Sequence, residues 1–396
     1  MIKKTHKIAV LCKVLCTVVC TCLVCFGCVL PNTIENSAKA VELENGSIDC
    51  GCSGQAGCVM DVDTHRIFYA KNKDAKLPMA STTKVVTAIT AIENFDDLDT
   101  RMKIDDRAVG IEGSSIYLKK GEELSLRELL YGLMLRSGND SAIAIAYMVA
   151  GGVEQFAEMM NNLAQKVGAT NSHFTNPHGL DDPNHYTTAY DLALLSSYAL
   201  NNKDFAEIVK TKTIKICEGE ENYRYLVNKN KLLYNMPDCI GVKTGYTKKS
   251  GRCLVSASER DNLRVVSVVL NCGPMFEESK DMLNAVQDKY KSVEIVEPYH
   301  YYKSVPVNNG EQKTVELYSR EGLRLPLSEK ERANISVEYN LPESLDAPVE
   351  GEKIVGDIKV YYGKRLIFSQ NVYTMDNVDS KLLKDKVKDI LDEWSI

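Results

Sequence analysis

The segment that most constrains this chain runs from Pro78 through Ser81 and Lys84 into the apolar residues 85–92. A proline ends an extended segment, and a serine at the start of the following helix caps its free N–H groups. A lysine three residues further on lies on the same helical face. The apolar run predicts a buried helix, and burial lowers the pKa of a lysine so that it can act as a base. The segment therefore predicts that Ser81 is a nucleophile and that Lys84 takes its proton. Because Ser-x-x-Lys is common by chance, the rest of the chain must support this interpretation.

The first 40 residues differ from the rest in composition. Residues 1–7 are basic, residues 8–30 are apolar apart from Lys13 and the thiols, and Ala38-Lys39-Ala40 matches a small-x-small cleavage site. This pattern predicts a signal peptide over residues 1–40 and an exported protein. The alternative is a transmembrane anchor, because the apolar run approaches the length of a membrane span.

Removal of this leader makes the chain more acidic. The leader carries five lysines and one glutamate, so the remaining chain has 43 basic and 53 acidic residues and a net charge of −10. Nucleic-acid binding needs a basic face, so no nucleic-acid partner is expected. Seven cysteines remain, and an odd number outside the cell implies a free thiol or an intermolecular bond. Cys50, Cys52 and Cys58 lack the further ligands of a tetrahedral site, so we expect no metal.

The order of the expected elements predicts an α+β fold and several domains. Two strands near residues 56–70 form a hairpin, a helical block follows, and antiparallel strands then lead to a closing helix over 276–290. This order differs from the regular βαβ alternation of a parallel sheet. Short strands with turn signals after Pro298 predict a small all-β domain. The expected divisions are a flexible lead-in (41–54), a catalytic domain (55–295), a β-rich domain (296–377) and an amphipathic helix (378–396).

Helix signals place two more polar segments. Ser125 and Glu128 form a capping box that begins a helix through Leu135. That helix breaks at residues 137–140, and a second apolar helix follows from Ser141, which fixes Ser137 and Asn139 in the interior or on a cleft wall. Thr188 is expected to cap a later helix. The loop before it contains two histidines, for which we expect hydrogen bonding within the loop rather than catalysis, namely His178 and His185.

The last helix, over residues 379–396, has one apolar stripe. We expect this helix to make peripheral contact with a membrane, with the single tryptophan at the interface. Packing against the β-rich domain is the alternative. Four lysines against five acidic residues give the helix no attraction to anionic lipid. The stripe consists of Leu382, Leu383, Val387, Ile390, Leu391 and Trp394.

Three short motifs stand in order along the chain and suit one chemistry. They are Ser81-x-x-Lys84, Ser137-Gly138-Asn139 and Lys243-Thr244-Gly245. Together they match the serine acyl-enzyme set of penicillin-binding proteins and class A β-lactamases. In this scheme Ser81 is the nucleophile, Lys84 the general base and Ser137 the proton relay to the leaving amine.

The remaining predicted roles concern substrate binding. Asn139 orients the lysine or holds the substrate amide, while Lys243 and Thr244 offer a charge and a hydroxyl to a free carboxylate. Gly245 allows the strand to approach the substrate closely. The N–H groups of Ser81 and Tyr246 form the oxyanion hole.

Further segments extend the likeness over residues 50–290. They include Glu112-Gly113-Ser114-Ser115, Tyr117-Leu118 and Asn176-Pro177-His178-Gly179-Leu180-Asp181. With these motifs the chain resembles the low-molecular-mass penicillin-binding proteins. More narrowly, it is similar to D-alanyl-D-alanine carboxypeptidases of the S11 peptidase family, including the sporulation-associated members of Gram-positive, endospore-forming bacteria.

The resemblance implies a β-lactamase/transpeptidase-like catalytic domain, an antiparallel sheet with a helical block. It implies removal of the terminal D-alanine from peptidoglycan stem pentapeptides on the cell-wall side of the membrane, in cell-wall biogenesis and cell shape. It also implies covalent inhibition by β-lactam antibiotics, and it requires no cofactor or metal.

Three alternatives stay open on the sequence. A class A β-lactamase uses a Glu-x-x-Leu-Asn segment after the second motif, and the chain has no such segment. An endopeptidase that cuts peptide cross-links would carry the same motifs. A cell-surface binding module with an inactive peptidase fold is the alternative of a different class, and the complete motif set argues against it.

Overall fold

The computed structural model describes residues 43–382, 384 and 387. The predicted signal peptide and most of the predicted terminal helix lie outside the described residues. Within the described part, no helix is both long and apolar enough to cross a membrane.

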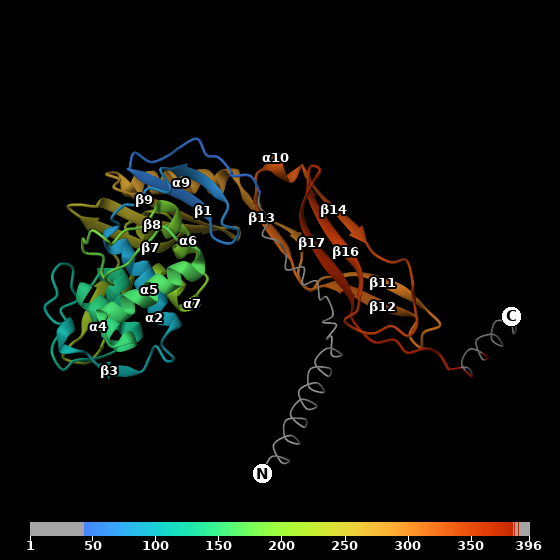
Figure 1. Cartoon of the computed structure of the whole chain (residues 1–396), viewed down its shortest axis with the longest axis horizontal. Helices are drawn as coiled ribbons and strands as arrows, with labels where there is room; N and C mark the ends of the chain where they lie inside the picture. Colours follow the sequence, from blue (N-terminus) through green and yellow to red (C-terminus); the bar gives the residue numbers. More distant parts are fainter. Residues whose placement is uncertain (1–42, 383, 385–386, 388–396) are drawn as a thin grey trace, which may run out of the picture. The chain divides into compact units, whose positions relative to one another are not determined.

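A five-stranded sheet in which every neighbouring pair is antiparallel forms the centre of the catalytic region (Figure 1). Successive side chains of a strand point to opposite faces. In the first strand Cys58 and Met60 join one core, while Val59 joins another. Both faces are therefore covered. In spatial order the strands are β2 (Ile67–Lys71), β1 (Ala56–Asp61), β9 (Leu263–Leu270), β8 (Gly251–Arg260) and β7 (Cys239–Thr247).

Helices cover the two faces unequally (Figure 1). The larger core joins one face to a block of helices, whereas the smaller core joins the other face to α9 (Met275–Lys289) and α8 (Leu232–Asn235). The block consists of α2 (Lys84–Glu93), α3 (Leu126–Tyr131), α4 (Asn139–Ala150), α5 (Val153–Val167), α6 (Ala189–Leu200) and α7 (Lys203–Lys210). Two small two-stranded antiparallel sheets accompany it, β3 (Arg101–Lys103) with β4 (Glu123–Ser125), and β5 (Thr213–Ile216) with β6 (Arg224–Val227).

The expected helix caps have mixed outcomes. Both hydrogen bonds of the Ser125 capping box are present, and Thr188 caps α6, as predicted. The prediction that Ser81 caps its helix is wrong, because Ser81 lies inside a 3₁₀ turn and α2 begins only at Lys84. The second helix begins at Asn139, two residues earlier than expected.

The C-terminal region has its own apolar core, built around a six-stranded sheet. The strand β10 (Lys291–Val296) pairs with β13 (Leu323–Leu327), which precedes the short helix α10 (Glu329–Arg332). The predicted boundary at residue 295 stays a prediction. In spatial order the six strands are β14 (Ile335–Asn340), β16 (Ile354–Tyr362), β17 (Arg365–Thr374), β12 (Thr314–Ser319), β11 (Tyr301–Asn308) and β15 (Leu345–Asp346).

One buried arginine connects the two regions. The Arg66 side chain is 3% exposed and forms an ion pair with Glu331. It also donates a hydrogen bond of 2.6 Å to the main-chain oxygen of Pro326, and its guanidinium lies 5.3 Å from the ring centre of Tyr290. Mixed α and β elements, antiparallel sheets and a β-rich C-terminal region confirm the predicted fold class.

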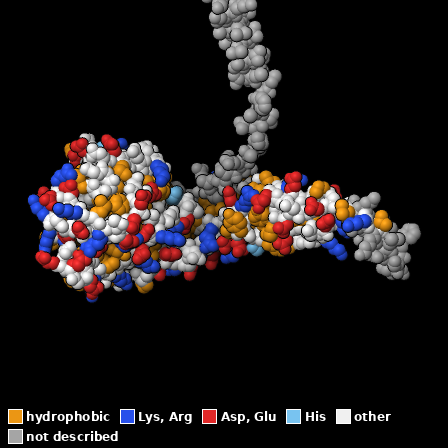
Figure 2. Space-filling view, turned by 90° about the horizontal axis from the view of Figure 1, so that it is seen from below, with side chains coloured by type: hydrophobic (Ala, Val, Ile, Leu, Met, Phe, Trp, Pro, Cys, Tyr) orange, Lys and Arg blue, Asp and Glu red, His pale blue; other side chains and the backbone are white. Residues whose placement is uncertain are grey.

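The surface carries charges of both signs. On the face seen in Figure 2, acidic and basic side chains are interspersed. That face therefore presents no large field of a single sign.

Candidate active site

Ser81 lies in a 3₁₀ turn, Ala80–Thr83, directly before the buried helix α2. Ala80 has φ +49°, a left-handed conformation that is unusual for a residue with a Cβ atom. Two glycines pack against this turn. A Cβ atom on Gly179 would lie 2.0 Å from the carbonyl oxygen of Ala80, and one on Gly245 would lie 3.1 Å from the nitrogen of Ser81. The turn Ala80–Thr83, which we call the nucleophile turn, therefore packs directly against the backbones of Gly179 and Gly245.

Lys84 is fully buried, and its ammonium nitrogen has three polar neighbours. Nζ lies 3.0 Å from Ser81 Oγ, 2.8 Å from Asn139 Oδ1 and 2.6 Å from the main-chain oxygen of His178. Residues from three separate parts of the chain therefore meet at one nitrogen.

The electrostatic surroundings favour a neutral Lys84. Burial lowers the pKa of Lys84 well below its ordinary value, and the positive charges of Lys243 and Lys229 lower it further. A neutral amine has two N–H donors and one lone pair. Because Asn139 Oδ1 and the His178 carbonyl can only accept hydrogen bonds, they take the two N–H groups. The lone pair then faces Ser81 Oγ, which can donate its proton to it.

The second motif lies at the end of a π-helical turn, Gly132–Arg136. Ser137 follows in a left-handed conformation with φ +66°, and Asn139 begins α4. The amide of Asn139 is oriented by its two ends, since Nδ2 donates to the oxygen of Glu112 at 2.6 Å while Oδ1 faces Lys84. Both motif side chains are buried.

Asp140, the next residue, holds the loop that forms one side of the site. Its carboxylate accepts hydrogen bonds from the backbone N–H groups of Ile116 and Leu118 and from the hydroxyl of Ser115. This buried carboxylate fixes the loop from which the main-chain oxygen of Glu112 reaches Asn139.

The third motif lies on the edge strand β7. Lys243 is 1% exposed, and burial together with the charge of Lys229 lowers its pKa to about 7. Its Nζ donates to the oxygen of Thr244 at 3.0 Å. Gly245 approaches the Ser81 backbone, while the side chain of Tyr246 is 66% exposed.

Sequence reasoning missed one cation of this site. Lys229 follows the β6 strand, its side chain is exposed, and Nζ lies 3.2 Å from Ser114 Oγ. Its charge lowers the pKa of both Lys84 and Lys243. No periodic or motif signal marks this lysine, which becomes visible only when the chain is folded.

The two loop histidines are buried or half-buried and hydrogen-bonded within the protein. Burial lowers the pKa of His178 to about 3 and that of His185 to about 4, so both rings are neutral at pH 7. Nδ1 of His178 accepts from the N–H of Leu180. This agrees with the expected hydrogen-bonding role.

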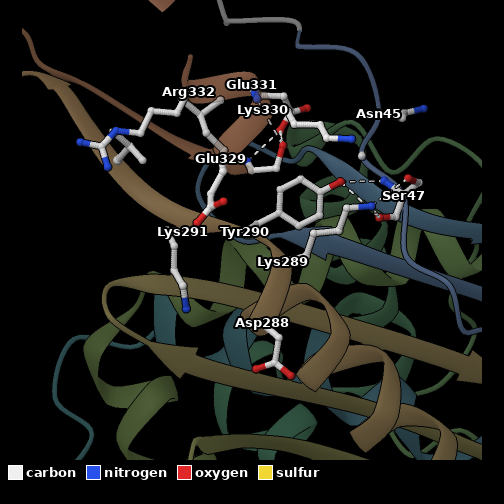
Figure 3. A pocket seen from close by; sticks show the side chains of 14 residues that line it. Asn45, Ser47, Asp288, Lys289, Tyr290, Lys291, Glu329, Lys330, Glu331 and Arg332 are labelled. Atoms are coloured by element: carbon white, nitrogen blue, oxygen red, sulfur yellow. Dashed lines mark hydrogen bonds between the residues drawn. The ribbon is translucent and has the colours of Figure 1, made fainter. Parts of the chain in front are cut away.

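A separate hollow of about 740 Å³ lies beside α10 (Figure 3). Tyr290 and Lys289 project into it, and both bond to Ser47. Lys289 Nζ also lies 3.3 Å from Ser47 Oγ, but both side chains are exposed, whereas Lys84 is fully buried beside Ser81. Because only a buried lysine has its pKa lowered by loss of water, we place the chemistry at the nucleophile turn. Among the described residues, no group of three His, Cys, Asp or Glu side chains is placed to hold a metal ion, and the seven cysteines described are free.

The fold and the buried serine–lysine site define a serine peptidase with the fold of the penicillin-binding proteins. Residues 47–273 match the Peptidase S11 family model, described as D-alanyl-D-alanine carboxypeptidase. Residues 290–380 match the model of the penicillin-binding protein 5 C-terminal domain. The chain belongs to the S11 family of D-alanyl-D-alanine carboxypeptidases.

Individual relatives agree with this assignment. The chain is similar to the D-alanyl-D-alanine carboxypeptidase DacF of Bacillus subtilis, with 28% identity over 334 residues, 82% of this chain and 86% of the relative. DacC of Escherichia coli is 31% identical over 343 residues, 82% of this chain and 84% of the relative. The crystal structure of penicillin-binding protein 5 from Haemophilus influenzae has a TM-score of 0.66 at 26% identity and covers 83% of this chain and 98% of its own.

Proposed function

We propose that this carboxypeptidase removes the terminal D-alanine from peptidoglycan stem pentapeptides through an acyl-enzyme on Ser81. The observation that carries the proposal is the contact of Lys84 Nζ with Ser81 Oγ, at 3.0 Å, in surroundings that lower the pKa of the lysine and so favour the neutral amine. A neutral amine beside a serine hydroxyl is the arrangement that turns this weak nucleophile into a reactive one.

The reaction begins when Ser81 Oγ attacks the carbonyl carbon of the penultimate D-alanine and its proton passes to Lys84 Nζ. The carbonyl oxygen becomes an oxyanion that accepts from the N–H groups of Ser81 and Tyr246. Collapse breaks the amide bond, and the proton held by Lys84 Nζ passes through the Ser137 hydroxyl to the leaving amine of the terminal D-alanine, which makes Lys84 neutral again. Water then attacks the ester carbonyl and gives a proton to Lys84 Nζ. Lys84 returns this proton to Ser81 Oγ as the ester bond breaks, and the shortened peptide leaves as a carboxylate.

In this proposal the third motif, Lys243-Thr244-Gly245, binds the C-terminal end of the substrate peptide. The free carboxylate of the terminal D-alanine pairs with Lys243 and accepts from the hydroxyl of Thr244. Asn139 orients Lys84 and holds the substrate amide. A β-lactam presents a carboxylate and a reactive carbonyl to the same groups, so we propose that it acylates Ser81.

The setting of the enzyme follows from the same proposal. Its substrate lies outside the cytoplasmic membrane, so residues 1–40 serve in export and residues 379–396 make peripheral contact with the membrane. A role during sporulation is part of the proposal, and the timing of expression tests it.

The test is release of D-alanine from a peptide ending in D-Ala-D-Ala. Ser81→Ala removes the attacking oxygen and should lower kcat by at least about a thousandfold. Ser336→Ala, an exposed serine on β14, is the matched control and should keep the wild-type rate. Wild-type activity in Ser81→Ala would contradict the mechanism, and release of cross-linked peptides without free D-alanine would indicate an endopeptidase.

A further inference from the structure

His185 lies directly behind the nucleophile turn. Its side chain is 4% exposed and stands edge-on to the ring of Phe174, with ring centres 5.8 Å apart. Nδ1 lies 3.1 Å from the backbone nitrogen of Thr175, and Nε2 lies 2.8 Å from Oγ1 of Thr83. Each ring nitrogen therefore has a different partner on a different segment.

The partners determine the tautomer of the ring. A backbone N–H can only donate, so Nδ1 of His185 accepts from Thr175 and the proton of the neutral ring lies on Nε2. Burial lowers the pKa of His185 to about 4, although the charge of Asp182 opposes this shift. The ring is neutral at pH 7 and donates its Nε2–H to the hydroxyl of Thr83.

The Thr83 hydroxyl connects the ring of His185 to the backbone of the nucleophile turn. Because Thr83 Oγ1 accepts from His185, its own proton is free for the carbonyl oxygen of Ala80, which lies 2.8 Å away. Ala80 has φ +49°, and a residue in such a conformation persists only when its surroundings hold it there. Gly179 closes the other side of that carbonyl.

The carbonyl of Ala80 and the N–H of Ser81 belong to one planar trans peptide, in which they point in opposite directions. When the Ala80 oxygen is held by the Thr83 hydroxyl, the Ser81 N–H must therefore point away from Thr83 and His185. That N–H is the donor which the proposed function assigns to the oxyanion.

We infer that His185 is a positioning residue, which aims the Ser81 N–H at the oxyanion through the Thr83 hydroxyl and the Ala80 carbonyl. The inference rests on the proposed acylation of Ser81. Nothing in it requires His185 to touch the substrate or to exchange a proton during turnover.

Two amide variants separate the ring nitrogens. In His185→Gln the side-chain NH₂ group reaches the place of Nε2 and still donates to Thr83. In His185→Asn the amide oxygen takes the place of Nδ1, keeps the bond to Thr175 and loses the donor to Thr83. His173→Asn is the matched control, because His173 is an exposed histidine of the same segment.

The readouts are the rate of acylation by a penicillin, and kcat and KM for D-alanine release. His185→Asn should lower acylation and kcat by about tenfold or more, because a misaimed oxyanion donor acts in the transition state, with KM within about twofold. His185→Gln should retain most of the rate, and His173→Asn all of it. Thr83→Val should lose as much as His185→Asn, and the double variant should lose little more, since both act through one path.

Equal rates in His185→Gln and His185→Asn, or a wild-type rate in His185→Asn, would overturn the inference. If His185→Asn shows no cooperative unfolding, Thr83→Val decides alone, and an unchanged acylation rate in that variant overturns the inference. A wild-type chain that is acylated by penicillin but releases no D-alanine refutes the proposed substrate, while the acylation rates still test His185.

Discussion

Two buried lysines lie in the site, and their environments suit the opposite roles that the proposed mechanism gives them. Burial, and then the positive charges of Lys243 and Lys229, lower the pKa of Lys84 and so favour the neutral amine that the proposed base must be. The pKa of Lys243 is lowered only to about 7, so a substrate carboxylate can restore its charge. The two titrations are coupled, and the resulting pH limits belong to the pair.

This difference predicts a bell-shaped pH dependence of kcat/KM. Activity rises with pH as Lys84 loses its proton, and it falls above about pH 7 as Lys243 in the free enzyme loses its own. In kcat the alkaline limb should move to higher pH, because the bound carboxylate raises the pKa of Lys243. Initial rates measured from roughly pH 5 to 10 give both profiles.

Lys243→Arg isolates the alkaline limb. A guanidinium stays protonated throughout this range, so the alkaline fall of kcat/KM should disappear while the acid limb remains. An alkaline limb that persists unchanged in Lys243→Arg would show that another group produces it.

At this scale the sequence could identify the three motifs, because each is short and its members lie within three residues. It could not identify Lys229, whose charge reaches Lys84 and Lys243 only after folding. The main-chain oxygen of His178 is likewise invisible in a side-chain motif, although it lies 2.6 Å from Lys84 Nζ.

Among the elements, the nucleophile turn differs most from expectation. A helix capped by Ser81 was the natural interpretation of Pro78 followed by serine and an apolar run. The close backbones of Gly179 and Gly245 instead hold residues Ala80–Thr83 as a 3₁₀ turn. The serine hydroxyl is thereby free to contact Lys84 rather than the helix N–H groups. Tertiary contacts decide this, which is why local pattern could not.

Gly179→Ala tests how closely the loop must approach that turn. Gly179 has φ +85°, and its new Cβ atom would collide with the Ala80 oxygen. Gly121→Ala is the matched control, because Gly121 has φ +78° with no atom within 4 Å of a new Cβ. The control should lose about 1–2 kcal/mol of unfolding free energy from the left-handed backbone alone.

Gly179→Ala should lose clearly more than the control, together with most of its acylation rate. Chemical denaturation and penicillin acylation measure the two quantities. Equal losses of stability in both variants, with acylation intact, would show that the loop does not support the nucleophile turn.

For the whole molecule, the order of elements was enough to predict the fold class. Strands, a helical block, further strands and a closing helix correspond to one antiparallel sheet covered on both faces. The sequence could not predict that β1 pairs with β9, more than 200 residues away, because pairing over such a distance leaves no local signal. Nor did it predict the buried link between Arg66 and Glu331.

The most direct test of this account is to incubate the full chain with a fluorescent penicillin and to determine the intact mass and the labelled peptide. The account predicts one stable penicilloyl group per chain on the peptide that contains Ser81, and none in Ser81→Ala. Folded protein without an adduct, or with its adduct on another peptide, would contradict the assignment of Ser81 and Lys84 as the catalytic pair.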